Sequence, residues 1–326
     1  MIRTNLKTYV AGIDISYDLT TYAIVDLRGA IIAKDSFLTT DYPKVNDFVA
    51  HLTECLVMFF EDHCGYDRIR SVGVSVPSGN NISGSIINSP NMQWSGVIPL
   101  AALLRDRLGL AVSLANDGHA RALGEFTYGS ARGMKDFVLV ALGHGLGSTF
   151  FSQGRVHLGA EGFGGEVGHS CIVEGGRLCG CGHQGCLEAY CAHKGIIQTA
   201  HEVMEESSEP SLMRSLTDLN PKTIKECCDE GDALAIEVYR RTGYLLGIGL
   251  ANYASVINPE AIILSGGIAR AGHWLTDPME ESFEEHVFRN IKGKVKLLHS
   301  VLTDMERDVL GASALAWSVK EYSLFI

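Results

Sequence analysis

The sequence predicts an α/β protein, and three observations lead to this class. Short segments rich in Val, Ile, Thr and aromatic residues alternate with longer segments of helical periodicity through the first 115 residues. Glycine-rich turns follow several of the predicted strands. The chain has 326 residues, which is enough for two domains that each bury a core. Such alternation places helices over a mostly parallel or mixed sheet.

The first predicted elements are three consecutive strands in YVAGIDI (9–15) and TTYAIVDLRGAIIAKDSF (20–37), with a turn at LRG. Apolar residues at helical spacing then predict a helix over 45–63. A buried strand, a helix that ends at Gly109 and a further strand follow it. These three elements lie within 70–77, 99–109 and 111–117.

The second part of the chain begins after NDGHARALGEF (116–126) and repeats the opening layout. DFVLVALGHGLGSTFFSQGRVH (136–157) contains a strand, a glycine-rich turn, a second strand and a tight SQGR turn. NPEAIILSGGIA (258–269) predicts another strand after a buried helix. This repeated pattern predicts two related lobes with a short hinge.

Composition and charge exclude several classes of function. The net charge is −11, from 27 basic and 38 acidic side chains, so we expect no nucleic-acid partner. The N-terminus lacks the apolar region of a signal peptide, and the apolar run 245–257 is too short for a membrane span. We therefore expect a cytoplasmic protein without a membrane partner. Its nine cysteines should be reduced there, which favours metal binding or catalysis over disulfides.

A cluster of metal-ligand residues lies in EVGHSCIVEGGRLCGCGHQGCLE (166–188). Three thiolates, from Cys179, Cys181 and Cys186, and the imidazole of His169 form a closed tetrahedral set, which is typical of structural zinc. The alternatives are a group of buried reduced cysteines or a thioredoxin-like redox site, and the latter needs two residues between its cysteines. The pattern predicts a structural zinc loop.

Three further segments place polar or glycine residues at strand ends. Asp117 closes a strand and opens a helix, where a carboxylate can act as a general base or simply cap the helix. The turn LGHGLGS (142–148) can cradle phosphate oxygens with backbone amides, or serve only as a hairpin turn. The two glycines after the strand in 258–269 suit a nucleotide. Each signal is ambiguous alone.

Together these segments resemble the ROK family of sugar kinases and repressors, within the sugar kinase, Hsp70 and actin superfamily. The resemblance covers essentially the whole chain. It is carried by GIDIS, SPN, ANDGHARALGE, GHGLGSTFFSQGRVHLGAEGFGGEVGH, CGCGHQGCLE and NPEAIILSGGI.

The resemblance implies a two-lobed, ribonuclease H-like fold of the actin and hexokinase type, with a cleft between the lobes. We expect a smaller N-terminal lobe, 1–117 plus a C-terminal helix at about 304–326, and a larger lobe, 118–303, with the zinc loop 169–186. By the same resemblance, a homodimer or homotetramer is expected.

The resemblance also implies roles for individual residues. Asp117 is expected to be the catalytic base, and Asp14 to organise Mg²⁺. The expected sugar contacts are Asn91, Asn116, Glu166, His169 and Glu188, with His169 also binding zinc. The turns that face ATP are expected at Gly143, Gly145, Gly266 and Gly267.

The chain departs from the family pattern at its first phosphate loop. ROK kinases usually continue the first strand with Asp, any residue, Gly, Gly, Thr, whereas this chain has Ser16, Tyr17 and Asp18 after Asp14 and Ile15. A carboxylate that faces a triphosphate opposes its binding unless a cation offsets it. Alternatively, Asp18 turns outward as a turn residue. His144 likewise replaces a usual threonine.

These observations predict ATP-dependent phosphorylation of a hexose, glucose or an N-acetylated amino sugar, at the 6-hydroxyl. The alternative is a non-catalytic sugar-binding or sensor protein with an altered phosphate loop. A repressor is disfavoured, because the first strand begins at Tyr9 and leaves no room for a preceding helix-turn-helix.

Overall fold

The computed structural model describes residues 7–89, 92–160 and 164–319. The chain forms two compact units. The first combines residues 1–132 with 301–326, and the second spans residues 133–300. Helix α3 (Asp117–Thr127) therefore belongs to the first unit, whereas the boundary expected from the sequence is at residue 117. Within the described segments, no helix is both long enough and apolar enough to cross a bilayer.

The first unit contains a five-stranded mixed sheet in the order β3-β2-β1-β4-β8. β1, β2 and β3 are antiparallel neighbours, as the three predicted opening strands require, and β4 and β8 continue the sheet in parallel. The strands are β1 (Tyr9–Ile15), β2 (Leu19–Asp26), β3 (Ile31–Leu38), β4 (Ile69–Ser75) and β8 (Ala111–Ala115). A small second sheet consists of β5 (Gly79–Asn80), β6 (Ser85–Ile87) and β7 (Val97–Ile98).

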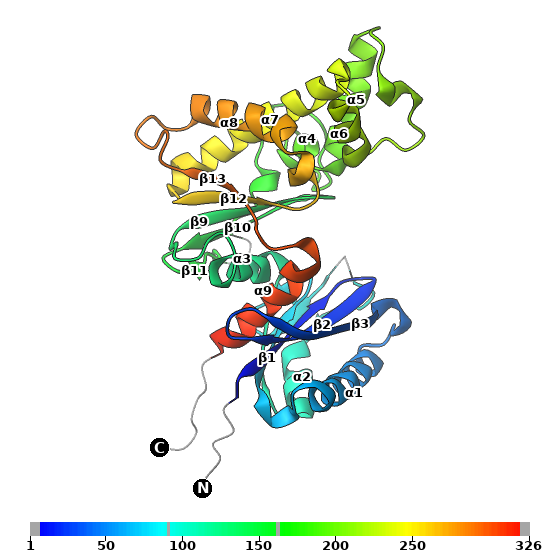
Figure 1. Cartoon of the computed structure of the whole chain (residues 1–326), viewed down its shortest axis with the longest axis vertical. Helices are drawn as coiled ribbons and strands as arrows, with labels where there is room; N and C mark the ends of the chain where they lie inside the picture. The colour runs from blue at the N-terminus through cyan, green and yellow to red at the C-terminus, as the bar shows by residue number, and fades with distance from the viewer. Residues whose placement is uncertain (1–6, 90–91, 161–163, 320–326) are drawn as a thin grey trace. The chain divides into compact units, whose positions relative to one another are not determined.

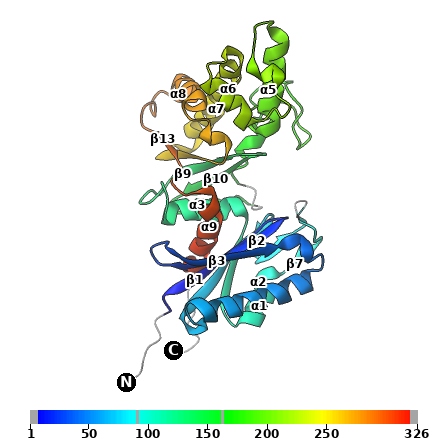
Figure 2. The same cartoon turned by 45° about the vertical axis from the view of Figure 1, so that its right-hand side comes forward.

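Helices cover both faces of this sheet (Figures 1 and 2). α1 (Val45–His63) and α2 (Leu100–Leu108) cover one face, and α9 (Asp304–Ser318) lies on the other. α1 has the predicted bounds, and α2 ends at the left-handed Gly109 as predicted. Alternate residues of β1 divide between the two cores: Ile13 packs in the α1 cluster and Val10 in the α9 cluster.

The close approach of α9 to the sheet depends on glycines. Gly12 and Gly73 are paired across β1 and β4. A Cβ on Gly12 would lie 2.2 Å from the Val309 carbonyl oxygen, and one on Gly73 would lie 1.9 Å from that of Ala312. α3 (Asp117–Thr127) crosses α9 equally closely, since a Cβ on Gly311 would lie 2.6 Å from the Ala120 carbonyl oxygen. Glycines thus bring three backbones together beside the carboxyl end of β1.

The second unit repeats the sheet of the first. Its strand order is β11-β10-β9-β12-β13, with β9, β10 and β11 antiparallel and β12 and β13 added in parallel. The strands are β9 (Phe137–Leu142), β10 (Leu146–Ser152), β11 (Arg155–Val156), β12 (Ala261–Ser265) and β13 (Lys296–His299). This repetition confirms the predicted α/β class, its mixed sheets and its two related halves.

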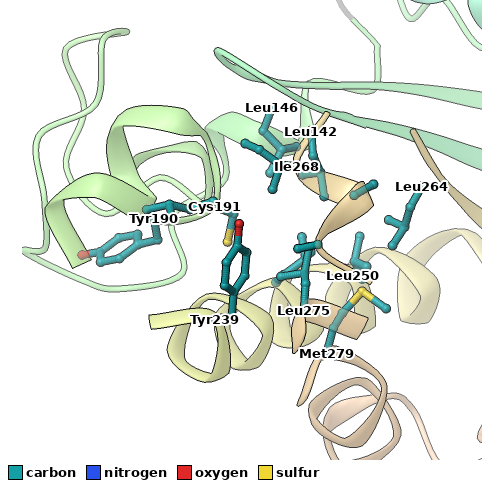
Figure 3. Packing of buried hydrophobic residues seen from close by; sticks show 14 of the residues in the cluster. Leu142, Leu146, Tyr190, Cys191, Tyr239, Leu250, Leu264, Ile268, Leu275 and Met279 are labelled. Carbon is teal, nitrogen blue, oxygen red and sulfur yellow. The ribbon is translucent and has the colours of Figure 1, made fainter. Parts of the chain in front are cut away.

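The helices of the second unit gather on one side of its sheet (Figure 1). They are α4 (Glu188–Cys191), α5 (His193–Glu206), α6 (Pro221–Asp229), α7 (Ala233–Ile257) and α8 (His273–His286). Figure 3 shows Leu250 of α7 and Leu275 of α8 packed with Leu142 and Leu264 from the strand ends. A Cβ on Gly247 would lie 2.5 Å from the Met279 carbonyl oxygen, so α7 and α8 also pack at close range. This core supports the loops that carry the polar residues.

Candidate functional site

The predicted metal ligands come together in the second unit. The ligand atoms of His169, Cys179, Cys181 and Cys186 lie within 4.8 Å of one another. The Sγ atoms of Cys181 and Cys186 are 3.7 Å apart, and Nδ1 of His169 is 3.7 Å from Sγ of Cys179. Bonds of about 2.3 Å at tetrahedral angles require thiolates about 3.8 Å apart, far beyond the roughly 2.0 Å of a disulfide. The cluster therefore fits a tetrahedral zinc ion.

The loop that carries these ligands is held by its own backbone. The amide of Cys179 donates to the His183 carbonyl at 2.8 Å, and that of Gly182 donates to Cys179 at 2.9 Å. Gly185 adopts φ +81°, and a Cβ there would lie 1.9 Å from the Val173 carbonyl oxygen. Burial, followed by the neighbouring thiols, raises the pKa of Cys186 to about 12. A metal ion would replace that proton and complete the site.

Two predicted sugar contacts flank the metal cluster. Glu166 is exposed and precedes the 3₁₀ turn Val167–His169, which places the imidazole. Glu188 begins α4, two residues after Cys186, and its Oε2 accepts a hydrogen bond from the Leu146 amide at 2.9 Å. The zinc loop and these carboxylates thus form one continuous structure.

Asp117 lies at the carboxyl end of β8, where α3 begins. The helix is capped by Asn116, whose side-chain oxygen accepts from the Gly118 amide at 2.9 Å. The Asn116 amide group keeps its two N–H donors for other partners. Asp117 is therefore not needed as the cap. Its carboxylate lies 3.1 Å from the Arg121 guanidinium and its side chain is 32% exposed.

Three carboxylates gather around Arg121 in the first unit. Nε of Arg121 donates to Asp308 on α9 at 2.6 Å, while its Nη1 pairs with Asp117. The third carboxyl is Asp14 at the end of β1, which accepts from the Ser75 hydroxyl at 2.8 Å. Burial and then Asp308 raise the pKa of Asp14 to about 7, although Ser75 and Arg121 oppose the shift. Such a carboxyl gains most from a bound cation.

The altered phosphate loop forms a tight hairpin turn. The Ser16 hydroxyl donates to the Leu19 carbonyl at 2.9 Å and accepts from the Leu19 amide at 3.1 Å. Tyr17 is 51% exposed, and Asp18 is exposed as well. A cavity of about 390 Å³ lies beside this turn, and Asp14, Ser16, Lys34 and Asp308 are among its lining residues. Asp18 therefore occupies an exposed turn position.

A larger cavity, of about 600 Å³, lies in the second unit between the two predicted nucleotide turns. Gly143 and Gly267 line it, as do His144, His193, Lys222, Lys225 and Arg270. Gly266 packs against the end of β9 rather than lining the cavity. Its φ is +90°, and a Cβ there would lie 2.3 Å from the Leu142 carbonyl oxygen. The lining combines glycine backbone, basic side chains and one carboxylate, Glu226, and its excess of basic groups suits an anionic ligand.

Sequence reasoning did not find every residue of these sites. It missed Arg121 and Asp308, and it missed the basic side chains of the larger cavity. The spacing of four residues between Asp117 and Arg121 was an available signal, since such pairs share a helix face. Asp308 reaches Arg121 only through the close crossing of α3 and α9. Asn91, a predicted sugar contact, lies outside the described residues.

Comparisons with known proteins identify the family of this chain. The model of the ROK family matches residues 10–319. A glucokinase from Halalkalibacterium halodurans is 28% identical over 319 residues, covering 96% of this chain and 95% of the relative. The xylose repressor of Bacillus subtilis is 26% identical over 297 residues, covering 90% of this chain and 73% of the repressor.

A solved structure extends the comparison to the fold. The ROK family glucokinase from Streptomyces griseus, solved in complex with glucose and AMPPNP, has a TM-score of 0.75 and 27% identity. The match covers 95% of this chain and 99% of that protein. This chain belongs to the ROK family. Its kinase relatives support sugar phosphorylation, and repressors are relatives as well.

Proposed function

We propose that this protein is an ATP-dependent sugar kinase that phosphorylates a hexose, glucose or an N-acetylated amino sugar, at the 6-hydroxyl. The observation that carries the proposal is the position of Asp117 at a strand end, with the capping role taken by Asn116. The carboxylate is partly exposed and so accessible to a hydroxyl. Phosphoryl transfer depends mainly on positioning and electrostatics, which such a residue supplies.

In the proposed reaction, the sugar hydroxyl oxygen forms a bond to the γ-phosphorus of ATP. The bond between that phosphorus and the β,γ-bridging oxygen breaks, and ADP leaves. The hydroxyl proton passes to the Asp117 carboxylate. Asp14 would hold Mg²⁺, which offsets the charge of the phosphates, and the cavity beside Gly143 and Gly267 would take the nucleotide.

The proposed sugar contacts each have a physical role. Asn116 retains N–H donors for a sugar hydroxyl, and Glu166 is an exposed acceptor. His169 would hold zinc through Nδ1, the atom nearest Cys179, and leave Nε2 for the sugar. Zinc would perform no chemistry; it would anchor the loop between Glu166 and Glu188. Asn91 is proposed as a further contact, and a cytoplasmic homodimer or homotetramer remains part of the proposal.

A non-catalytic sugar-binding protein is the second candidate, and two observations favour it. Ser16, Tyr17 and Asp18 replace the glycine-rich phosphate loop. Arg121 also engages the Asp117 carboxylate in an ion pair at 3.1 Å, so one of its oxygens already has a partner.

A coupled ADP-release assay with Mg²⁺, ATP and a panel of hexoses separates the two candidates. We expect turnover with at least one hexose, and a fall of about 10²-fold or more for Asp117→Asn, since general bases contribute this much. Asp106→Asn is the matched control, because Asp106 is an exposed carboxylate on α2. No turnover by the unmodified protein, with a hexose still raising its melting temperature, would identify a binding protein.

A further inference from the structure

We propose that Glu188 couples the zinc loop to the glycine turn at residues 143–146, so that zinc and nucleotide each strengthen the binding of the other. The nucleotide part of this proposal rests on the proposed function, whereas the link between loop and turn rests on contacts within the second unit. Glu188 thereby acts as a positioning residue in addition to its proposed sugar contact.

Glu188 contacts both partners directly. Its Oε2 accepts from the Leu146 amide at 2.9 Å, immediately after the turn. Its Oε1 lies 3.7 Å from Sγ of the ligand Cys179. The fit is close, because a Cβ on Gly145 would lie only 2.7 Å from Oε2. The carboxylate therefore fills the space between the turn and the metal ligand.

The zinc loop contacts Leu146 a second time, independently of Glu188. Gly168 precedes the ligand His169, and a Cβ on Gly168 would lie 2.3 Å from the Leu146 carbonyl oxygen. Leu146 is thus contacted at its N–H by Glu188 and at its carbonyl by the segment that carries His169. A shift of the metal ligands would change both contacts.

The other end of the turn is held by the same helical segment. The His193 amide at the start of α5 donates to the Gly143 carbonyl at 3.0 Å, and the Gly143 amide donates to Gly145 at 3.0 Å. The rings of His144 and His193 lie 5.2 Å apart, and both line the larger cavity. Residues 188–193 therefore connect the zinc loop to the wall of the cavity.

This arrangement has a thermodynamic consequence. Zinc fixes Cys179, Cys186 and His169, and through them the positions of Glu188 and Gly168. If that order favours the turn that binds nucleotide, then nucleotide must favour zinc by the same factor. Couplings of this kind change affinities by about 5-fold to 150-fold. The zinc affinity then reports on the turn without any enzymatic readout.

The test measures the zinc affinity of the purified protein by equilibrium competition with a chromogenic chelator, with and without MgADP. For the unmodified protein we expect MgADP to raise the zinc affinity by about 5-fold or more. Gly145→Ala should bind zinc more weakly and lose the MgADP effect, because its methyl group displaces the Glu188 carboxylate. Gly147→Ala is the matched control, since a Cβ there meets nothing within 4 Å. Circular dichroism verifies that each variant is folded.

Two variants of Glu188 itself complete the test. Glu188→Gln keeps an acceptor for the Leu146 amide and should preserve the MgADP effect, whereas Glu188→Ala should abolish it. Equal zinc affinities of Gly145→Ala and Gly147→Ala would overturn the link between loop and turn. If calorimetry detects no MgADP binding to the unmodified protein, the nucleotide part and the proposed function both fail. The difference in zinc affinity between Gly145→Ala and Gly147→Ala then still decides whether Glu188 links the zinc loop to the turn.

Discussion

Asp14 is a partly buried carboxyl whose chemistry depends on four neighbours. Its hydrogen bond from Ser75 and the charge of Arg121 favour the ionised form, while burial, Asp308 and Asp117 oppose it. The outcome is a pKa of about 7, well above the ordinary value of 3.8. A side chain in this state exchanges a proton for a cation readily, which is consistent with the Mg²⁺ role proposed for it.

This pKa predicts a pH dependence of stability. Between 3.8 and about 7 the folded protein keeps a proton on Asp14 that the unfolded chain has released. The stabilisation from that proton is complete below the unfolded value and is lost as the pH rises through about 7, so the free energy of unfolding falls over this range. Asp14→Asn retains an acceptor for Ser75 and removes the titration.

Urea unfolding at about pH 5 and about pH 8 measures this effect. Asp14→Asn should be stabilised relative to the unmodified protein at the higher pH, and the difference should shrink at the lower one. Each unit of pKa shift corresponds to about 1.4 kcal/mol. Asp106→Asn, at an exposed site, should leave the profile unchanged. Parallel profiles for the unmodified protein and Asp14→Asn would contradict the assignment.

At the scale of elements, α9 organises the first unit. It touches the sheet at Gly12 and Gly73 and crosses α3 at Gly311, with no room for a methyl group at any of the three. These contacts place Asp308 beside Arg121 and opposite the carboxyl end of β1. The acidic site therefore depends on helix packing as much as on its own side chains.

Gly73→Ala tests this dependence. The added Cβ would lie 1.9 Å from the Ala312 carbonyl oxygen, so α9 must shift. We expect a loss of about 1–3 kcal/mol of unfolding free energy, the usual cost of overpacking. Gly147→Ala on β10 is the control, because its Cβ meets nothing within 4 Å. Equal urea midpoints for the two variants would show that α9 accommodates the methyl group without cost.

At the scale of the whole molecule, the two units have separate hydrophobic clusters and repeat one sheet topology. The four candidate metal ligands all belong to the second unit. Because each unit buries its own core, loss of the metal should loosen the second unit selectively.

Hydrogen exchange on Cys181→Ser tests this selectivity. Cys181 is an exposed ligand, so the substitution removes a metal bond without disturbing the core. We expect zinc to be lost and amide protection to fall over 169–191, with β1, β4 and α9 unchanged. Cys64→Ser, in the first unit, should keep one zinc ion per chain by elemental analysis. Uniform loss of protection in both units would instead indicate a single cooperative structure.

Much of this molecule was predictable because its signals are local. The three opening strands, the helix Val45–His63 and the left-handed end at Gly109 follow from side-chain periodicity and glycine geometry. The tetrahedral cluster was predictable as well, since three of its four ligands lie within eight residues, from Cys179 to Cys186. A short loop has few conformations that bring such ligands together, so their arrangement can be predicted from their spacing.

Sequence patterns are enough to indicate the α/β class, the repeated halves, the cysteines and histidine of the candidate zinc cluster, and the carboxylate at the end of β8. Two contacts depend on the tertiary structure: Arg121 joins Asp117 to Asp308, and Glu188 accepts a hydrogen bond from the Leu146 amide. The two kinds of feature differ in how far apart the interacting residues lie in the sequence. Periodicity and ligand spacing act between residues close in sequence, whereas Arg121 and Asp308 are 187 positions apart and meet only because glycines let two helices touch.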